Sequence, residues 1–333
     1  MATTVCSVCF SNVGRGTGAL PELDRQTVVS GRKKNNIVFV SADDLCTYLG
    51  ATLTVSGSIW LFVRNRQRIK FTLGVKEMQG DNSYAVYDYA SSGPAAYSFS
   101  WKSVLPEAPF VEDGKKYVPA ELAALQMGAL ITGNKDDRFT IFDFQVNGKT
   151  PYADSNQYII GGSWITGWES YASHKLAPHF KISELWDRGA SSGTRGYHQL
   201  RIAVALLESL EAVRHYYRND ASLSLVCVFR SWTYNKSISG ADPRSLHMQG
   251  RAFDVPSSAY GTTLYEQIRT EFRAGNSGDL HSGNPLPKGF HRTQTSSGKS
   301  KGYEIETMPR VDSSGKEKTW LHLQVKPGAG EKP

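Results

Sequence analysis

The chain lacks any run of about 20 apolar residues, the length that crosses a bilayer, so no transmembrane helix is expected. Its first residues, MATTVCSVCFSNVGRG, have no basic start followed by an apolar core, and we expect no secretory signal. Cysteine is scarce. Cys46 and Cys227 lie inside apolar runs and are interpreted as small core residues. Cys6 and Cys9 form one CxxC without a second pair or a nearby histidine, a weak metal or disulfide signal, and the alternative is a frayed terminus with two thiols.

What remains is an ordinary globular composition with an excess of positive charge. With 40% hydrophobic and 21% charged residues, the chain is neither disordered nor collagen-like, and 333 residues suffice for about two domains. The net charge of +7 favours an anionic partner. Charge alone does not distinguish between nucleic acid, anionic wall polymer and acidic membrane. No DNA- or RNA-binding motif accompanies this charge, so we expect no nucleic-acid partner.

The N-terminal part contains an internal duplication. A short apolar strand, IVFV, precedes a helix over SADDLCTYLGA, and SIWLFVRNRQRIKFTL predicts two strands around a polar turn near Asn65. The same order returns as KKYVPAELAALQMGA followed by LITGNKDDRFTIFDF. Val40 aligns with Val118 and Gly50 with Gly128, each pair 78 positions apart. The repeat of strand, helix and hairpin is a structural signal.

The pattern YVPAELAALQMGA resembles the copper-amine-oxidase N-terminal-like (stalk) domain of bacterial surface proteins, over roughly residues 30–146. No histidine cluster lies in this half, so we infer no copper; the resemblance implies adhesion or spacing. The hairpin turn carries a basic cluster that is either simply solvated or binds an anionic polymer. Its members are Arg64, Arg66, Arg68 and Lys70.

Residues 245–254, SLHMQGRAFD, place a histidine and an aspartate seven positions apart. Gly250 between them permits a tight backbone path. The following AFDV predicts a short strand on which Asp254 and Phe253 face opposite sides. His247 and Asp254 therefore come from one loop–strand unit.

A third residue that can bind the same metal ion, His322, lies in WLHLQV near the end of the chain. His322 alternates with Leu321 and Leu323 and so faces away from these apolar neighbours. Zinc binds histidine nitrogen and carboxylate oxygen, and catalytic zinc sites commonly use three protein ligands and one water. If the strand of His322 lies beside that of Asp254, the two residues and His247 form an open tetrahedral site. A hydrogen-bonded core histidine is the alternative for His322.

The stretch SLHMQGRAFD fits S-x-H-x-x-G-x-A-x-D and resembles the zinc D-Ala-D-Ala carboxypeptidase and endopeptidase family M15, whose catalytic fold is shared with the Hedgehog signalling domain. HFKISELW, VFRSWTYNKSISGADPRS and WLHLQV agree with it, so the resemblance covers about residues 175–326. It implies that the zinc ligands are His247, Asp254 and His322.

The resemblance also implies roles for residues around the ligands. Arg230 binds the substrate carboxylate or stabilises the developing oxyanion, with a structural ion pair as the alternative, and Ser245 orients backbone or substrate. The sequence departs from the family pattern at the general base. Thr319 and Gln324 stand where many relatives have acidic residues. A Hedgehog-like arrangement favours Glu306 as the base. The candidates considered are Glu304, Glu306 and Glu317.

The sequence thus predicts a two-domain α+β protein. Its parts are an N-terminal extension (1–29), a duplicated stalk-like attachment domain (30–146), a linker (147–170) and an M15-like, Hedgehog-type zinc domain (171–333). We expect Zn²⁺-dependent hydrolysis of peptidoglycan stem-peptide bonds, at a D-amino acid, by a phage-borne or secreted enzyme at the bacterial cell wall. The N-terminal domain binds anionic wall polymer in this interpretation. The alternative is a catalytically inactive, metal-containing wall-binding protein.

Overall fold

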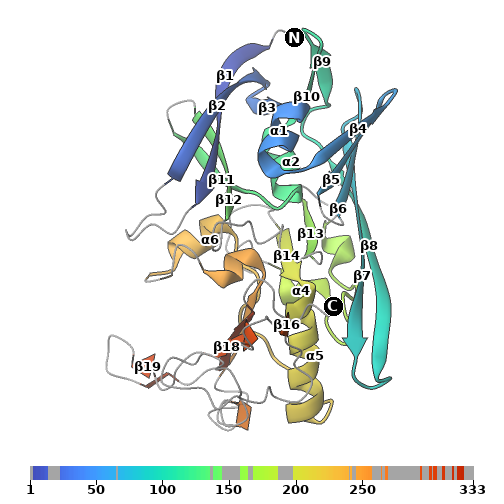
Figure 1. Ribbon diagram of the computed structural model, residues 1–333, viewed down its shortest axis with the longest axis vertical. Coiled ribbons are helices and arrows are strands. Elements are labelled where there is room, and N and C mark those ends of the chain that lie inside the picture. Colours follow the sequence, from blue (N-terminus) through green and yellow to red (C-terminus); the bar gives the residue numbers. More distant parts are fainter. Residues whose placement is uncertain are drawn as a thin grey trace.

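Helices and strands are mixed along the chain, which confirms the α+β class (Figure 1). The structure is a computed structural model. It describes residues 3–13, 23–64, 67–135, 138–144, 158–163, 168–186, 198–239, 241, 245–256, 264, 267–268, 293–294, 300–301, 303–305, 310–311, 317–318 and 321–325. Among these residues, no helix is both long and apolar enough to span a membrane.

The N-terminal half, residues 3–144, contains two sheets. A 7-stranded sheet has the order β11-β12-β1-β2-β3-β10-β9, in which β1 and β12 are parallel and the other neighbours antiparallel. A 5-stranded antiparallel sheet runs in chain order from β4 to β8. The first sheet consists of β1 (Thr4–Val13), β2 (Leu23–Lys34), β3 (Ile37–Ser41), β9 (Phe110–Glu112), β10 (Lys115–Pro119), β11 (Leu130–Lys135) and β12 (Arg138–Phe144). The second consists of β4 (Thr52–Ser56), β5 (Ile59–Arg64), β6 (Gln67–Thr72), β7 (Glu77–Asp88) and β8 (Gly93–Val104).

The predicted duplication is present in the structure. Helix α1 (Ala42–Leu49) follows β3, and helix α2 (Ala120–Gln126) follows β10. Strands β3 and β10 pair with Val40 opposite Val118, so two residues aligned in the sequence meet across the sheet. The repeats diverge after their helices, because β4 and β5 join the 5-stranded sheet whereas β11 and β12 join the 7-stranded one.

The first residues of the chain belong to the larger sheet. Strand β1 lies between β2 and β12, so the stretch predicted as an extension supplies an inner strand. Cys6 and Cys9 are three positions apart on β1, and their side chains point to opposite faces. Cys6 and Cys9 are not joined by a disulfide, and neither Cys46 nor Cys227 forms one. The frayed-terminus interpretation of the CxxC is wrong, and its two cysteines share no site.

Arg64 is a buried residue and not part of an exposed basic cluster. Its side chain is 4% exposed, and Nη1 donates a hydrogen bond of 2.6 Å to the carbonyl of Met127, at the C-terminal end of α2. A cation is favourable at that end of a helix dipole. Arg68 is exposed, Lys70 is half-buried, and Arg66 lies outside the described residues. The sequence interpretation of Arg64 as a surface cation is therefore wrong.

The C-terminal half combines helices with small antiparallel sheets. The sheets are β13-β14, β15-β21-β18, β16-β17 and β19-β20. Helix α5 contacts β7 of the N-terminal half and β21 of the C-terminal half. The helices are η1 (Trp168–Tyr171), α4 (Ile182–Leu185), α5 (Val204–Arg218), α6 (Trp232–Ser237) and η3 (Leu246–Gln249). The strands are β13 (Tyr158–Ser163), β14 (His198–Ala203), β15 (Ala252–Val255), β16 (Thr293–Gln294), β17 (Ser300–Lys301), β18 (Tyr303–Ile305), β19 (Arg310–Val311), β20 (Glu317–Lys318) and β21 (Leu321–Val325).

Two predicted elements of this half differ from the structure. Helical spacing predicts a helix from Leu200, but residues 198–203 form β14 and the helix begins at Val204. The apolar run LSLVCVF predicts a buried strand, whereas the structure has an extended segment whose β-pairing is an isolated bridge from Cys227 to Asp254. The bridge still places this segment beside β15.

The two halves share one apolar core, and polar contacts join them. The long hairpin β7–β8 runs beside α5, where the backbone N–H of Tyr87 donates to Glu208 Oε1 at 3.2 Å (Figure 1). The Tyr84 hydroxyl donates to the carbonyl of Leu176 at 3.0 Å. Strand β13, within the predicted linker, pairs with β14 of the C-terminal half. The halves are therefore packed together and not merely tethered.

Candidate metal centre

A one-turn helix holds His247 in place. Ser245 caps η3 by accepting a hydrogen bond of 3.3 Å from the backbone N–H of His247. Gly250 ends the turn with a φ of 63°, and a Cβ there would lie 2.0 Å from the carbonyl oxygen of Arg201. Glycine is required at this position both by the left-handed backbone and by the close approach of β14. The predicted tight path through Gly250 is confirmed.

The imidazole of His247 is buried and oriented by the backbone. Its Nδ1 donates to the carbonyl of Val228 at 2.8 Å, and Nε2 lies 3.3 Å from Asp254 Oδ2. A histidine that donates one ring N–H to a carbonyl while presenting its other nitrogen to a shared centre is typical of metal ligands. Burial by itself lowers the pKa of His247, but the Asp254 carboxylate, with a smaller effect from Cys227, raises it to about 9.

Asp254 lies between the two histidines. Strands β15 and β21 pair with Asp254 directly opposite His322, and His322 Nδ1 donates to Asp254 Oδ1 at 2.6 Å. The rings of His247 and His322 have centroids 5.1 Å apart. Burial by itself raises the pKa of Asp254, but the two histidines hold it well below its ordinary value. The predicted neighbouring strands therefore bring both histidines to one carboxylate.

The alternation predicted for the last strand is also present. Leu321 and Leu323 are buried while His322 is half-buried on the other face of β21. The Nε2 atom of His322 lies 3.1 Å from Gln324 Oε1. Gln324, which stands where the family resemblance led us to expect an acid, thus contacts the second imidazole directly.

Arg230 lies at the edge of the same group. Its Nη2 is 3.7 Å from Asp254 Oδ2, and Nη1 donates to Asn235 Oδ1 at 3.1 Å. Its backbone N–H donates to the carbonyl of His247 at 3.2 Å. The ion pair offered as the alternative is present, and it places the guanidinium beside the predicted ligands, 13% exposed.

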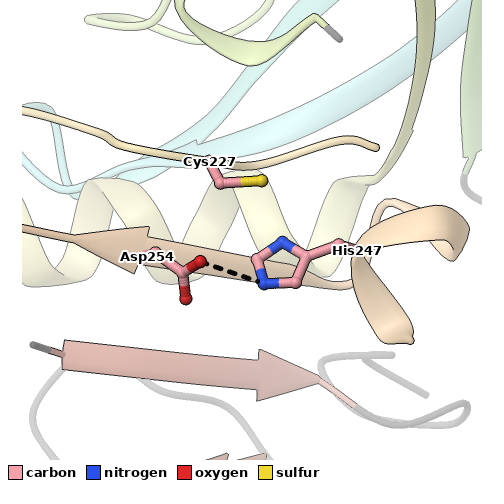
Figure 2. A group of neighbouring side chains, drawn as sticks. All are labelled: Cys227, His247 and Asp254. Atoms are coloured by element: carbon pink, nitrogen blue, oxygen red, sulfur yellow. Dashed lines mark ion pairs between the residues drawn. The ribbon is translucent and has the colours of Figure 1, made fainter. Parts of the chain in front are cut away.

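Cys227 belongs to this group, although the sequence interpretation made it a core residue. Ligand atoms of Cys227, His247 and Asp254 all lie within 4.8 Å of one another (Figure 2). Each comes from a different segment: the extended stretch before Arg230, η3 and β15. The apolar neighbours of Cys227 in the sequence gave no signal, because its proximity to Asp254 arises from a pairing between distant segments.

The general base remains a prediction. Glu306 lies outside the described residues. Glu304 and Glu317 lie in β18 and β20, where the backbone is described but their side chains are not. Register pairs Glu304 with Gln324, the residue that contacts His322.

The residues present fit a zinc ion. Histidine nitrogen, carboxylate oxygen and thiolate sulfur are the donors that zinc takes in proteins. Among the described residues, the buried Nε2 atom of His247 makes no hydrogen bond of standard geometry but faces Asp254 Oδ2 at 3.3 Å, and Asp254 offers a carboxylate shared by two imidazoles. A cation between these groups would replace the protons that now compensate the Asp254 charge.

Comparison with known proteins supports this interpretation of the C-terminal half. A sequence model of the family described as Peptidase M15 matches residues 178–281. The matched stretch contains Arg230, His247 and Asp254 and ends before His322. No curated protein and no solved structure matches the chain. Residues 30–146 lie outside the matched range, so their likeness to a stalk domain stays a prediction. The match, together with the cluster that it contains, supports a peptidase domain of family M15 in the C-terminal half.

Proposed function

We propose that the protein is a zinc-dependent peptidase that hydrolyses stem-peptide bonds of bacterial peptidoglycan, at a D-amino acid. The observation that carries the proposal is that His247 and His322 both face the carboxylate of Asp254, beside Arg230, with His247 and Asp254 inside the matched Peptidase M15 range. The family match supports a peptidase acting on peptidoglycan-type substrates. The metal identity and the bond are our proposal.

His247, Asp254 and His322 would hold the ion. When bound, zinc lowers the pKa of a water molecule from about 15.7 to about 7 and polarises a carbonyl. The chain's own residues supply the remaining functions. The carbonyl of Val228 fixes the ring of His247, and Ser245 fixes its backbone, so that Nε2 is held in one direction before substrate arrives.

Arg230 supplies positive charge at the substrate side. Its guanidinium is held by Asn235 and lies 3.7 Å from Asp254, where it can bind a substrate carboxylate or stabilise the oxyanion that forms at the scissile carbonyl. We propose Glu306 as the base that accepts a proton from water and passes it to the leaving amine. It directly follows Ile305, which pairs with Leu323, the neighbour of His322.

We propose the bacterial cell wall as the place of action, for a phage-borne or secreted hydrolase. The net charge of +7 suits an anionic envelope, and we propose that the N-terminal half contributes to attachment there.

The second candidate is a wall-binding protein that retains the metal but lacks turnover. One observation favours it. Within the described residues, the carboxylate shown at the site is Asp254, and it already accepts from His322 and faces His247 and Arg230. A carboxylate with these partners is a ligand and not a free base, so catalysis depends on an acid whose side chain the structure does not describe.

Digestion of purified peptidoglycan, followed by mass spectrometry of the released muropeptides and metal analysis of the same sample, tests the proposal. We expect the wild-type chain to contain stoichiometric zinc and to release new products. His247→Ala should lose both the zinc and the products, and a chelator should abolish product release by the wild-type chain. His215→Ala is the matched control. His215 lies on α5 and contacts Asp220 and Tyr89, away from the proposed metal centre. Bound metal without any product would establish the wall-binding alternative, and absence of bound metal would overturn both.

A further inference from the structure

Cys227 is a half-buried thiol within reach of the proposed metal position. Its sulfur belongs to the group with His247 and Asp254 whose ligand atoms all lie within 4.8 Å (Figure 2). His247 is 2% exposed, and its Nε2 faces Asp254 Oδ2 at 3.3 Å. A sulfur, a nitrogen and an oxygen from three different segments thus lie close enough together to share one ion.

The backbone explains why the sulfur is there. Cys227 and Asp254 are antiparallel partners, joined by hydrogen bonds of 2.8 Å from Asp254 N–H to the Cys227 carbonyl and from Val226 N–H to the Asp254 carbonyl. On the other side, Asp254 is the partner of His322. Directly opposed residues place their side chains on the same face of a sheet. Cys227, Asp254 and His322 therefore form a row on one face, which His247 meets from η3.

We propose that Cys227 is an additional metal ligand, which binds as the thiolate and gives the centre a preference for thiophilic divalent cations. The proposal rests on the metal site of the proposed function and extends it by one donor. Thiolate ligands favour zinc, cadmium and cobalt over magnesium and manganese, which prefer oxygen. The centre is thereby assigned a mixed sulfur, nitrogen and oxygen donor set.

The sulfur of Cys227 also contacts the guanidinium of Arg230, so its alternative role is that of a hydrogen-bond acceptor. Spectroscopy distinguishes this role from metal coordination. The Nε of Arg230 donates to Cys227 Sγ at 3.2 Å, while the other guanidinium nitrogens contact Asn235 and Asp254. A sulfur that served only as a hydrogen-bond acceptor would leave no spectroscopic trace on a bound metal. A sulfur that coordinates produces a charge-transfer absorption.

The test is Co²⁺ and Cd²⁺ binding to the full chain, stripped of metal by chelator. Wild type and the control Cys6→Ser should both show a near-ultraviolet sulfur-to-cobalt band, because Cys6 lies on β1 of the other half. Cys227→Ser should lose the band and bind Cd²⁺ about ten-fold more weakly or worse. Cobalt bound to wild type without the band, or a band unchanged in Cys227→Ser, would overturn the inference while leaving the proposed function intact. Failure of wild type to bind either ion would overturn both.

A second measurement needs no variant and therefore does not depend on the folding of Cys227→Ser. Saturating Zn²⁺ should slow alkylation of Cys227 in the wild-type chain at least about ten-fold, as read by peptide mass spectrometry. Cys6, also half-buried and outside any disulfide, is the internal reference whose alkylation rate should not change. Equal rates for Cys227 with and without zinc would contradict coordination.

Discussion

Positively charged side chains in the two halves of the molecule have two different kinds of partner. In the N-terminal half, Arg64 donates to the backbone carbonyl of Met127 at the end of α2. In the C-terminal half, Arg230 and His247 instead face a side chain of opposite charge, Asp254. A cation whose partner is a backbone carbonyl stabilises the fold, as Arg64 does and as Arg201 does in the C-terminal half. Arg230 and His247 differ because both face one carboxylate, which is the proposed metal ligand. The comparison therefore separates structural cations from cations at the proposed site.

The largest effect expected from this comparison is at the shared carboxylate. Asp254→Ala removes the group that faces both histidines, and peptidoglycan cleavage should fall about a thousand-fold or more, with loss of bound metal. Asp43→Ala is the control in the N-terminal half, where the aspartate side chain is 62% exposed beside Lys116. Release of soluble muropeptides measures both. Cleavage that survives in Asp254→Ala would place the chemistry elsewhere.

Two glycines with the same backbone conformation sharpen the comparison. Gly50 and Gly250 both have a φ of 63° at the end of a helical turn. Nothing lies within 4 Å of a Cβ at Gly50, so Gly50→Ala should lower the free energy of unfolding by about 1 kcal/mol. A Cβ at Gly250 would meet the backbone of Arg201, and Gly250→Ala should cost about 4 kcal/mol or more.

Urea unfolding of the two alanine variants measures this difference, and zinc affinity should fall in Gly250→Ala alone. Equal destabilisation by both substitutions would mean that η3 moves away from β14 at little cost. The close approach of Gly250 to Arg201 would then be irrelevant to the position of His247.

Arg201 forms hydrogen bonds to both halves of the molecule. Its substitution tests whether this connection supports the metal centre. Arg201 is 2% exposed and donates to the carbonyls of Ala129 at 3.0 Å and Met248 at 3.4 Å, the latter next to His247. Arg201→Met should lower the free energy of unfolding by about 3 kcal/mol and also weaken zinc binding about ten-fold. Arg64→Met should destabilise similarly without changing zinc affinity. Calorimetric zinc titration of both variants separates the outcomes, and an unchanged zinc affinity in Arg201→Met would contradict the link.

The smallest predicted effect concerns Glu121 in α2, far from any proposed chemistry. Burial raises the pKa of Glu121 from its ordinary value of 4.5 to about 7. Because the folded state holds this proton more tightly, the group's contribution to stability is complete below pH 4.5 and is lost as the pH rises to 7. Glu121→Gln should therefore gain about 3 kcal/mol relative to wild type between pH 4.5 and pH 8. A difference in unfolding free energy that stays constant with pH would contradict this.

Much of the metal centre follows from local sequence patterns. The alternation of Leu321, His322 and Leu323 fixes the face of the histidine, and Gly250 fixes the turn between His247 and Asp254. Likewise, the caps at Ser41 and Gly50 fix the ends of α1. These features depend on residues within a few positions of one another, so their periodicity and backbone preferences are visible in the sequence.

The features that the sequence missed depend on contacts between distant segments. Cys227 looks like a core residue in LSLVCVF until its segment is paired with Asp254. Arg64 reads as a surface cation because its acceptor, Met127, is 63 positions away. Nothing local marks Arg201 as a link to Ala129, 72 positions earlier. Pairing register and the burial of single cations are decided by tertiary packing, which overrides local patterns.

The central claim is that one divalent ion is held jointly by the imidazoles of His247 and His322 and the carboxylate of Asp254. A crystal structure of the zinc-loaded chain, with anomalous diffraction recorded on both sides of the zinc absorption edge, tests it most directly. We predict a single strong peak about 2.0–2.2 Å from a nitrogen of each histidine and an oxygen of Asp254. Zinc bound at another position, with these three side chains still paired only to one another, would contradict the account.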